Sequence, residues 1–385
     1  MINTKSSVNH EVALPMNFIN LSITGIELEN SKNHWLLRNF VAMRDIRKVS
    51  LESLTQWVVD SGEKKFRAKQ IWEWLWVKSA VSFEDMSNLP KGFREELKKE
   101  FSIHAIAISN TQTSNDGTIK SAFKLHDGHL VEGVLIPTDD RMTACVSSQV
   151  GCSLSCKFCA TGYMKRERNL DPGEIYDQVV TIRNQAEQNY DQALSNIVFM
   201  GMGEPLLNYK NVLEGIDRIT SPEGLGMSPK RITVSTAGIA KMIEKLADDK
   251  VKFNLALSLH AADDKKRDSI MPINETNTLD ALMIALRKFY DQTGNRITFE
   301  YILFYDFNDS IADADKLLRY ARKVPSKVNI IEYNPISEAS FTKADPQTID
   351  RFANHLIKGG VATSVRRSRG KDIDAACGQL ANKEK

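Results

Sequence analysis

Short apolar runs typical of buried strands alternate with longer amphipathic runs typical of helices from Arg141 to the C-terminal end. The predicted strands cover residues 143–147, 197–202, 231–235, 253–259, 297–304, 327–333 and, last, 361–365. The predicted helices cover residues 172–189, 209–220, 239–248, 279–293, 311–323 and 346–358. Six strand–helix units predict an α/β fold in which residues 141–385 form a partial (β/α)6 barrel, with ligands at the carboxyl ends of its strands.

A small helical domain is predicted ahead of the barrel, at residues 43–101. Ser50 has the residue type and position of an N-cap at the start of one helix. A later helix carries large apolar residues whose helical spacing predicts one shared face: Phe66, Ile71, Trp74 and Leu75. The pattern of basic residues in this domain favours an ordinary solvated surface.

Between the two domains, residues 102–140 are predicted to form a β linker, with strands at 103–109, 119–125 and 130–136. Glu132 lies inside the third strand, and alternation alone favours a position facing solvent. Residues 1–42 show little periodicity. They are interpreted either as an extension expected to be disordered or as a segment upstream of a start at Met43.

The composition is that of an ordinary globular chain, with 385 residues, of which 42% are hydrophobic and 26% charged. No apolar run approaches the roughly 20 residues that span a bilayer, and the N-terminal residues lack the pattern of a secretory signal. We therefore expect a cytoplasmic protein without a membrane partner, whose five cysteines stay reduced. The net charge of +2 neither requires nor opposes nucleic-acid binding.

Three of the cysteines, Cys152, Cys156 and Cys159, form a Cys-x3-Cys-x2-Cys pattern just after the first barrel strand. A cubane 4Fe–4S cluster has four iron corners, so three thiolates leave one iron open to a small molecule. Structural zinc prefers four ligands, and the fourth would have to come from Cys145, Cys377 or a distant histidine. Spacing alone therefore favours a cluster but leaves zinc or another ferredoxin-type site open.

Polar residues and glycines follow the next strands of the predicted barrel. Gly203 and Glu204 follow the second strand, Ser235 ends the third, and residues 258–260 (Ser-Leu-His) end the fourth. Asn334 follows the sixth strand. Each signal is weak alone, because a glycine turn is usually only a turn. Together, at one edge of a parallel sheet, they predict a ligand site beside the cysteine loop.

Two further cysteines lie outside the loop. Cys377 sits in a segment of small residues, which predicts that it is mobile and accessible, and four basic residues just before it would attract a polyanion. Cys145 lies on the first barrel strand. For both, the alternative is an inert buried cysteine that acts as a small hydrophobic residue.

Long stretches of the sequence resemble the RlmN family of radical-SAM RNA methyltransferases, which methylate carbon 2 of adenosine. The resemblance runs from about Gly62 to Leu380 and rests on these segments: Phe66–Gln70, Asn88–Pro90, Asp116–Thr118, Cys145–Cys152, Met200–Asn208, Ser258–Ala261 and Arg369–Leu380. Residues 336–343 depart from the family's glycine- and proline-rich loop.

The resemblance implies a 4Fe–4S cluster and S-adenosylmethionine (SAM), two molecules per turnover. It assigns Cys152, Cys156 and Cys159 to the cluster, and the following residues to SAM: Gly203, Glu204, Ser235, Ser258, Leu259, His260 and Asn334. It makes Cys377 the methyl-carrying thiol, Cys145 the thiol that resolves through a transient disulfide, and Glu132 the proton acceptor. The last assignment overturns the solvent-facing interpretation of Glu132.

The implied substrates are an adenosine in the peptidyl-transferase centre of 23S rRNA and adenosine 37 of some tRNAs. The implied partner is an external one-electron donor such as flavodoxin or ferredoxin, and the expected state is a monomer. The helical domain at 43–101 becomes an expected RNA-contacting module.

Three alternatives remain beside this hypothesis. A Cfr-type relative would share the thiol pair and the cluster but methylate carbon 8 of adenine. A non-enzymatic iron–sulfur protein that binds RNA, or a zinc module, would use the cysteine loop without catalysis.

Overall fold

The computed structural model describes residues 43–382, so the extension predicted at 1–42 lies outside the described residues. The strands are β1 (Arg44–Asp45), β2 (Phe101–Ser102), β3 (Ala107–Thr113), β4 (Ile119–Lys124), β5 (Leu130–Thr138), β6 (Arg141–Cys145), β7 (Gln149–Val150), β8 (Arg168–Asn169), β9 (Asn196–Phe199), β10 (Ile232–Thr236), β11 (Asn254–Ser258), β12 (Ile297–Leu303), β13 (Ser326–Glu332) and β14 (Thr363–Arg366).

The α-helices are α2 (Leu51–Asp60), α3 (Phe66–Trp76), α4 (Lys91–Glu100), α5 (Pro172–Tyr190), α6 (Tyr209–Thr220), α7 (Ala240–Asp248), α8 (Asp264–Ile270), α9 (Leu279–Thr293), α10 (Ile311–Ala321) and α11 (Pro346–Lys358). None of these described helices is long and apolar enough to cross a membrane.

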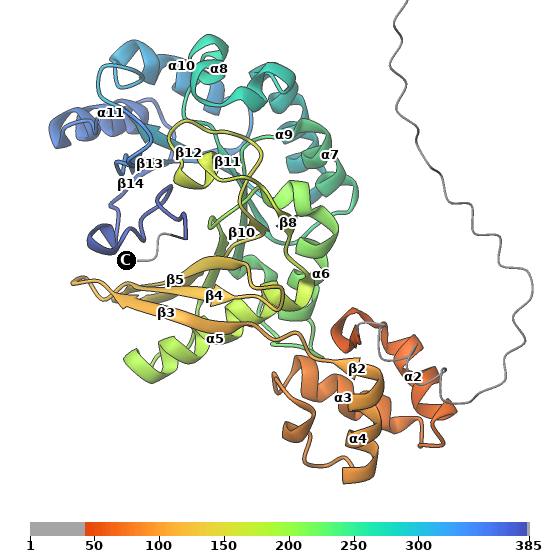
Figure 1. Ribbon diagram of the computed structural model, residues 1–385. Helices are drawn as coiled ribbons and strands as arrows, with labels where there is room; N and C mark the ends of the chain where they lie inside the picture. The colour runs from red at the N-terminus through yellow and green to blue at the C-terminus, as the bar shows by residue number, and fades with distance from the viewer. Residues whose placement is uncertain (1–42, 383–385) are drawn as a thin grey trace, which may run out of the picture. The chain divides into compact units, whose positions relative to one another are not determined.

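The main sheet has ten strands in the order β14-β13-β12-β11-β10-β9-β6-β5-β4-β3. All neighbouring pairs from β6 to β14 are parallel, and helices α6, α7, α9, α10 and α11 cover the outer side of the sheet (Figure 1). Parallel strands need both faces covered, which is why β12 is buried along its whole length. The predicted partial barrel is therefore confirmed.

Strands β3, β4 and β5 continue the same sheet as an antiparallel extension. The predicted boundary at residue 140 thus falls within a continuous sheet, and the predicted first strand at 103–109 lies at 107–113 instead. The solvent-facing position of Glu132 expected from alternation is wrong, because the residue is only 2% exposed. Alternation identifies residues that share a face, but it cannot show that the C-terminal segment covers that face.

Several predicted helices match the structure residue for residue, including α6, α9 and α11. Helix α8 was missed, since its seven residues, Asp-Lys-Lys-Arg-Asp-Ser-Ile, carry no apolar periodicity. It begins where the Asp263 carboxylate accepts a hydrogen bond from the Lys266 amide at 3.1 Å. The helix contributes Arg267, whose side chain is completely buried beneath the strand ends.

Helix α2 begins as predicted, with the Ser50 hydroxyl accepting from the Ser53 amide at 3.1 Å. The predicted buried face of α3 is partly wrong: Phe66 is 49% exposed, whereas Trp72 and Trp76 are buried. Trp76 is buried because it packs edge-on against Tyr176 of α5, with ring centroids 5.2 Å apart. Its backbone carbonyl also accepts from the Tyr176 hydroxyl at 2.7 Å.

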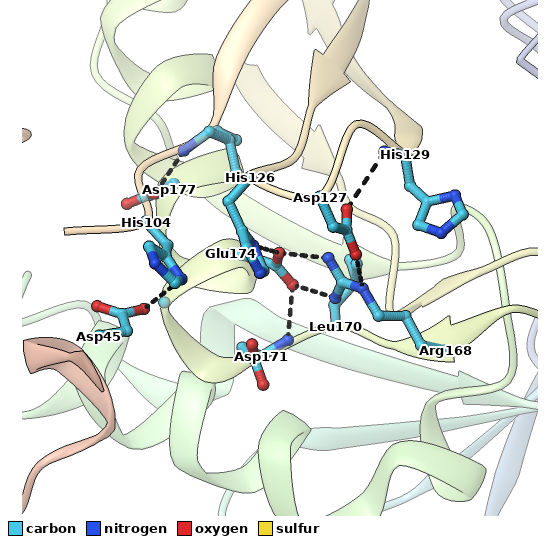
Figure 2. Close-up of polar contacts among 12 residues, drawn as sticks. Asp45, His104, His126, Asp127, His129, Arg168, Leu170, Asp171, Glu174 and Asp177 are labelled. Carbon is cyan, nitrogen blue, oxygen red and sulfur yellow. Dashed lines mark hydrogen bonds and ion pairs between the residues drawn. The ribbon is translucent and has the colours of Figure 1, made fainter. Parts of the chain in front are cut away.

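A network of hydrogen bonds and ion pairs surrounds the start of α5 (Figure 2). Glu174 binds the Arg168 guanidinium through both oxygens, at 2.7 and 2.8 Å, and Arg168 also binds Asp127. One helical turn further, both Asp177 oxygens lie 2.8 Å from Nη1 of Arg47. The Arg47 side chain is 3% exposed, so this ion pair is buried between the N-terminal segment and the barrel.

We predict that Arg47→Met lowers the free energy of unfolding by about 3–5 kcal/mol, because it leaves the Asp177 carboxylate buried without its cation. Urea unfolding of the purified chain measures this. The matched control is Arg44→Met, which removes an exposed pair with Glu100 and should cost about 1 kcal/mol or less. Equal losses in the two variants would contradict the importance of burial.

Candidate active site

A cavity that is partly open to solvent lies at the carboxyl ends of the barrel strands. Most of the residues predicted for the cluster, for SAM and for the methyl-carrying thiol line it: Cys152, Cys156, Cys159, Gly203, Glu204, Ser235, Ser258, His260 and Cys377. Residues separated by more than two hundred positions in the sequence therefore meet in one chamber, as expected for strand ends in a parallel α/β fold.

The cysteine loop forms one wall of this cavity. Its backbone is fixed by hydrogen bonds from the Lys157 amide to Ile270 O (3.0 Å) and from the Cys159 amide to Cys156 O (3.2 Å). Gly162 is required beside it, because a Cβ there would lie 2.7 Å from the Cys156 carbonyl oxygen. Phe158 packs edge-on against His260, with centroids 4.7 Å apart, and shields the loop from solvent.

The three loop thiols suit a 4Fe–4S cluster. They are free and face one cavity. Among residues 43–382 no group of three or more His, Cys, Asp or Glu has the spacing for a single metal ion. In a cubane each thiolate binds a separate iron, so the sulfurs stand further apart than ligands of one ion. Cys152, Cys156 and Cys159 would hold three irons, with the fourth facing the cavity.

Glu204 braces the turn after β9. Gly203 precedes it at φ +93°, and a Cβ there would lie 2.5 Å from Gln149. The Glu204 carboxylate accepts from the Leu206 amide at 3.0 Å and from the Ala237 amide at 2.8 Å. Burial raises the pKa of Glu204, although these donors oppose the rise. The side chain thus joins the ends of β9 and β10 while lining the cavity.

Neutral groups continue the lining on the next strands. The Ser235 and Ser258 hydroxyl oxygens are 3.3 Å apart. His260 accepts from the Ile302 amide through Nδ1 at 3.1 Å. Burial, followed by the charge of Arg267, lowers the pKa of His260 to about 3. His260 is therefore neutral at physiological pH, with its proton on Nε2.

Two residues predicted to bind SAM do not line the cavity. The Leu259 side chain is completely buried in the core. Asn334 is buried too, and its Nδ2 donates to the backbone carbonyl of Cys377 at 3.2 Å. Asn334 thus contacts the segment that carries the second predicted thiol.

The segment around Cys377 packs directly on the cysteine loop. Gly378 O accepts from the Ala160 amide at 2.7 Å, and Leu380 O accepts from the Thr161 hydroxyl at 2.6 Å. The Cys377 side chain is exposed to the cavity, but the surrounding walls raise the pKa of its thiol to about 11 through burial.

Cys145 lies at the end of β6 and is buried, with 8% exposure. Burial is the main cause that raises the pKa of Cys145 to about 12, and the neighbouring Cys377 thiol is the next. The two thiols are therefore close enough to interact electrostatically, and both are free.

Glu132 holds the end of the same C-terminal segment. Its Oε2 accepts from the Ala381 amide at 2.9 Å and from the Asn382 amide at 3.1 Å, and its Oε1 lies 3.3 Å from Lys120 Nζ. It lines a second, smaller cavity together with Lys120 and Asn382. The glutamate and Cys377 are thus tied to one short segment.

Carboxylates also hold the beginning of this segment, residues 367–382. Glu332 binds Arg367 at 2.7 Å and Lys371 at 2.8 Å. Asp116 accepts from the Gly370 amide at 2.9 Å. Asp116, which belongs to one of the segments that carry the family resemblance, therefore contacts a residue 254 positions away.

Two buried charged residues of the site were not anticipated from the sequence. Arg267 donates to the carbonyls of Leu259, Ser258 and Ala237, so it ties the ends of β10 and β11 together. Because α8 was missed, no signal pointed to it. Glu300 lines the cavity from the middle of β12. Its signal, a carboxylate inside an apolar strand, was the one already noted for Glu132.

Comparison with protein-family models gives two matches. Residues 44–103 match the Ribosomal RNA large subunit methyltransferase N-terminal domain, and residues 146–318 match the Radical SAM superfamily.

Curated relatives match over most of the chain. A protein of Cytophaga hutchinsonii named "Probable dual-specificity RNA methyltransferase RlmN" is 62% identical over 339 residues, which cover 88% of this chain and 93% of that protein. A "Dual-specificity RNA methyltransferase RlmN" of Nautilia profundicola is 40% identical, covering 88% and 99%. The crystal structure of a radical SAM methyltransferase from Sphaerobacter thermophilus is 39% identical, with a TM-score of 0.83, and covers 88% of this chain and 99% of that one.

The carboxylate of Glu332 should stabilise the fold in a pH-dependent way. Burial raises its pKa, but hydrogen bonds from Lys371 and Arg367 outweigh this and lower the pKa of Glu332 to about 2, against a usual value of 4.5. A carboxylate with a lowered pKa stabilises the fold above its unfolded pKa and loses this contribution as the pH falls. We predict that Glu332→Gln costs about 1–3 kcal/mol at pH 7 and that the cost shrinks between pH 4.5 and 2.

Urea unfolding of both proteins across this pH range measures the difference. The control is Asp350→Asn, since Asp350 is 58% exposed and lies 3.5 Å from Arg367. It should change stability little at any pH. A cost for Glu332→Gln that stays constant down to pH 3 would refute the ion-pair explanation.

Proposed function

Because the chain belongs to the RlmN family of radical-SAM RNA methyltransferases, we propose that it methylates carbon 2 of adenosine, in the peptidyl-transferase centre of 23S rRNA and at adenosine 37 of tRNAs. Membership makes it an RNA-methylating enzyme that uses a 4Fe–4S cluster and SAM. Family membership therefore contradicts two of the alternatives, the non-enzymatic iron–sulfur protein and the zinc module. The observation that carries the finer proposal is Cys377, a further thiol in the cavity of the three loop cysteines.

A carrier thiol answers a chemical need. Carbon 2 of adenine is not nucleophilic, so it cannot take a methyl group from SAM by polar substitution. A cysteine thiolate can, with the sulfonium losing its methyl group and leaving as a thioether. The cluster, when bound, supplies the electron that cleaves a second SAM to a radical able to abstract hydrogen from a methyl group. Cys377 faces the cavity in which both events take place.

The remaining steps use Cys145 and Glu132. Once the carbon carried by Cys377 is joined to carbon 2, protein and RNA are covalently linked, the adduct gives up its unpaired electron, which the oxidised cluster would accept, and Glu132 accepts the ring proton. The Cys145 thiolate then attacks the Cys377 sulfur: a disulfide forms, the bond from this sulfur to the carrier carbon breaks, and that carbon keeps the electron pair and takes up a proton to become the methyl group. An external one-electron donor such as flavodoxin or ferredoxin supplies the cluster's electrons, and two further electrons reduce the disulfide.

The contacts of Glu132 add a condition to this scheme. Its carboxylate already accepts two amide N–H groups, of Ala381 and Asn382, and pairs with Lys120. It can accept a proton from a substrate only when residues 381–382 move. Entry of the RNA would supply that movement. We further propose that the helical domain at 43–101 contacts the RNA, and that the enzyme works as a monomer in the cytoplasm.

The product identifies the function. The chain is purified anaerobically, reduced, and incubated with SAM and a transcript of the peptidyl-transferase region. Nucleosides from the digested RNA are then separated by liquid chromatography against standards and detected by mass spectrometry. We expect 2-methyladenosine. Its isomer 8-methyladenosine would instead support the Cfr-type reaction, and the absence of both would refute the proposed substrate.

The two thiols should fail in different ways. We predict that Cys145→Ala accumulates RNA covalently attached to the protein, because the adduct forms but cannot be resolved. Cys377→Ala should form no adduct, since the carrier is missing. Denaturing gels with labelled RNA show the adduct as a shifted band. Normal turnover by Cys145→Ala would eliminate its resolving role, and an adduct in Cys377→Ala would eliminate the carrier.

A further inference from the structure

A row of polar side chains crosses the floor of the barrel. Ser258 of β11 is the register partner of Glu300 of β12, Glu300 is the partner of Asn329 of β13, and Asn329 is the partner of Ser364 of β14. Register partners in neighbouring parallel strands point to the same face of the sheet. Ser258 and Glu300 line the cavity, so this face is the inner one.

The hydrogen bonds along this row are interrupted at one point. Ser364 donates to Asn329 Oδ1 at 2.7 Å, and Asn329 Nδ2 donates to Glu300 Oε1 at 2.8 Å. On the other side, the Ser258 and Ser235 hydroxyl oxygens are 3.3 Å apart. Glu300 Oε2 has no hydrogen-bond partner among the described residues, although the atom is fully buried and the residue is only 3% exposed.

Within residues 43–382, no cationic side chain supplies the missing donor. Arg366 is close enough for its charge to favour the Glu300 carboxylate, but burial outweighs it and raises the pKa of Glu300. The Arg366 guanidinium donates instead to the Met200 sulfur at 3.4 Å. A buried carboxylate oxygen without a donor destabilises the folded state. A ligand in the cavity that donates a hydrogen bond would remove this penalty.

We propose that Glu300 accepts a hydrogen bond from one ribose hydroxyl of SAM, with the hydroxyls of Ser235 and Ser258 beside it. A vicinal diol presents two O–H donors side by side, and an acidic side chain near the strand ends of α/β folds often binds a ribose hydroxyl. The inference rests on SAM as the cofactor, and so on family membership. It does not depend on which adenine carbon is methylated.

Equilibrium binding tests this directly. The probe is S-adenosylhomocysteine, which lacks the sulfonium charge, so a change in affinity cannot reflect attraction between the sulfonium and the carboxylate. It is compared with its 2′-deoxy and 3′-deoxy analogues on the cluster-reconstituted full chain, by anaerobic calorimetry. Glu300→Gln presents an N–H₂ where the free oxygen stood. We expect it to weaken S-adenosylhomocysteine about ten-fold or more.

The analogues locate the contact. At least one deoxy analogue should bind to wild type and to Glu300→Gln with the same affinity, within about two-fold. In that analogue the hydroxyl that donates to Glu300 is already absent. Equal weakening of S-adenosylhomocysteine and both analogues would overturn the proposal, since Glu300 would then act elsewhere. Unchanged affinity of Glu300→Gln for S-adenosylhomocysteine would overturn it as well.

Stability separates a binding role from a structural one. Without ligand, Glu300→Gln should melt at the same temperature as wild type or higher, because the unpartnered charge is gone. A clear fall would indicate a structural role and count against the proposal. The matched control is Glu174→Gln, a buried carboxylate outside the cavity whose oxygens bind Arg168 and the Asp171 amide (Figure 2). It should melt lower and bind S-adenosylhomocysteine normally.

Failure of the proposed function would be seen separately. A chain that forms no 2-methyladenosine but binds S-adenosylhomocysteine through its ribose would keep this inference and lose the substrate. A chain that forms the product while Glu300→Gln binds normally would do the reverse.

Discussion

The capture of the C-terminal segment by carboxylates is the contact on which the site depends. Residues 367–382 contain only one short 3-10 helix, so most of their backbone groups cannot be satisfied within the segment. Glu132 of β5 and Asp116 of the turn before β4 accept from backbone amides of the segment, and Glu332 of β13 binds the side chain of Lys371. In Figure 1 the segment, in dark blue, runs from β14 towards the ribbon of β5. These bonds hold Cys377 against the cysteine loop.

The same region combines two opposite requirements. Buried polar groups at the strand ends are mostly satisfied by neighbouring backbone, as with Glu204 and the Ala237 amide or His260 and the Ile302 amide. Such groups are rigid and keep the chamber in shape. Glu300 differs, since one of its oxygens lacks a donor within residues 43–382. A site that leaves one acceptor unsatisfied is less stable when empty and gains more when the matching ligand arrives.

Two adjacent residues of helix α5 connect the N-terminal segment to the strands beside the cavity. Asp177 binds Arg47 of the N-terminal segment. Its neighbour Gln178 binds both backbone groups of Ser147, at 2.8 and 3.2 Å, just beyond Cys145. The Ser147 hydroxyl in turn donates to the Glu132 carbonyl at 2.6 Å. The helical domain and the strands that carry Glu132 and Cys145 therefore contact the same helix.

The sequence by itself determined the strands, most helices, the cysteine loop and the glycine turns, because spacing and periodicity are local properties of the chain. It also supported the family resemblance, because the matching motifs are contiguous. Only the tertiary structure decided that Glu132 is buried beneath residues 381–382, that the Cys145 and Cys377 thiols interact electrostatically, and that one Glu300 oxygen has no partner within residues 43–382. Periodicity shows which residues share a face, but what covers that face depends on segments hundreds of residues away.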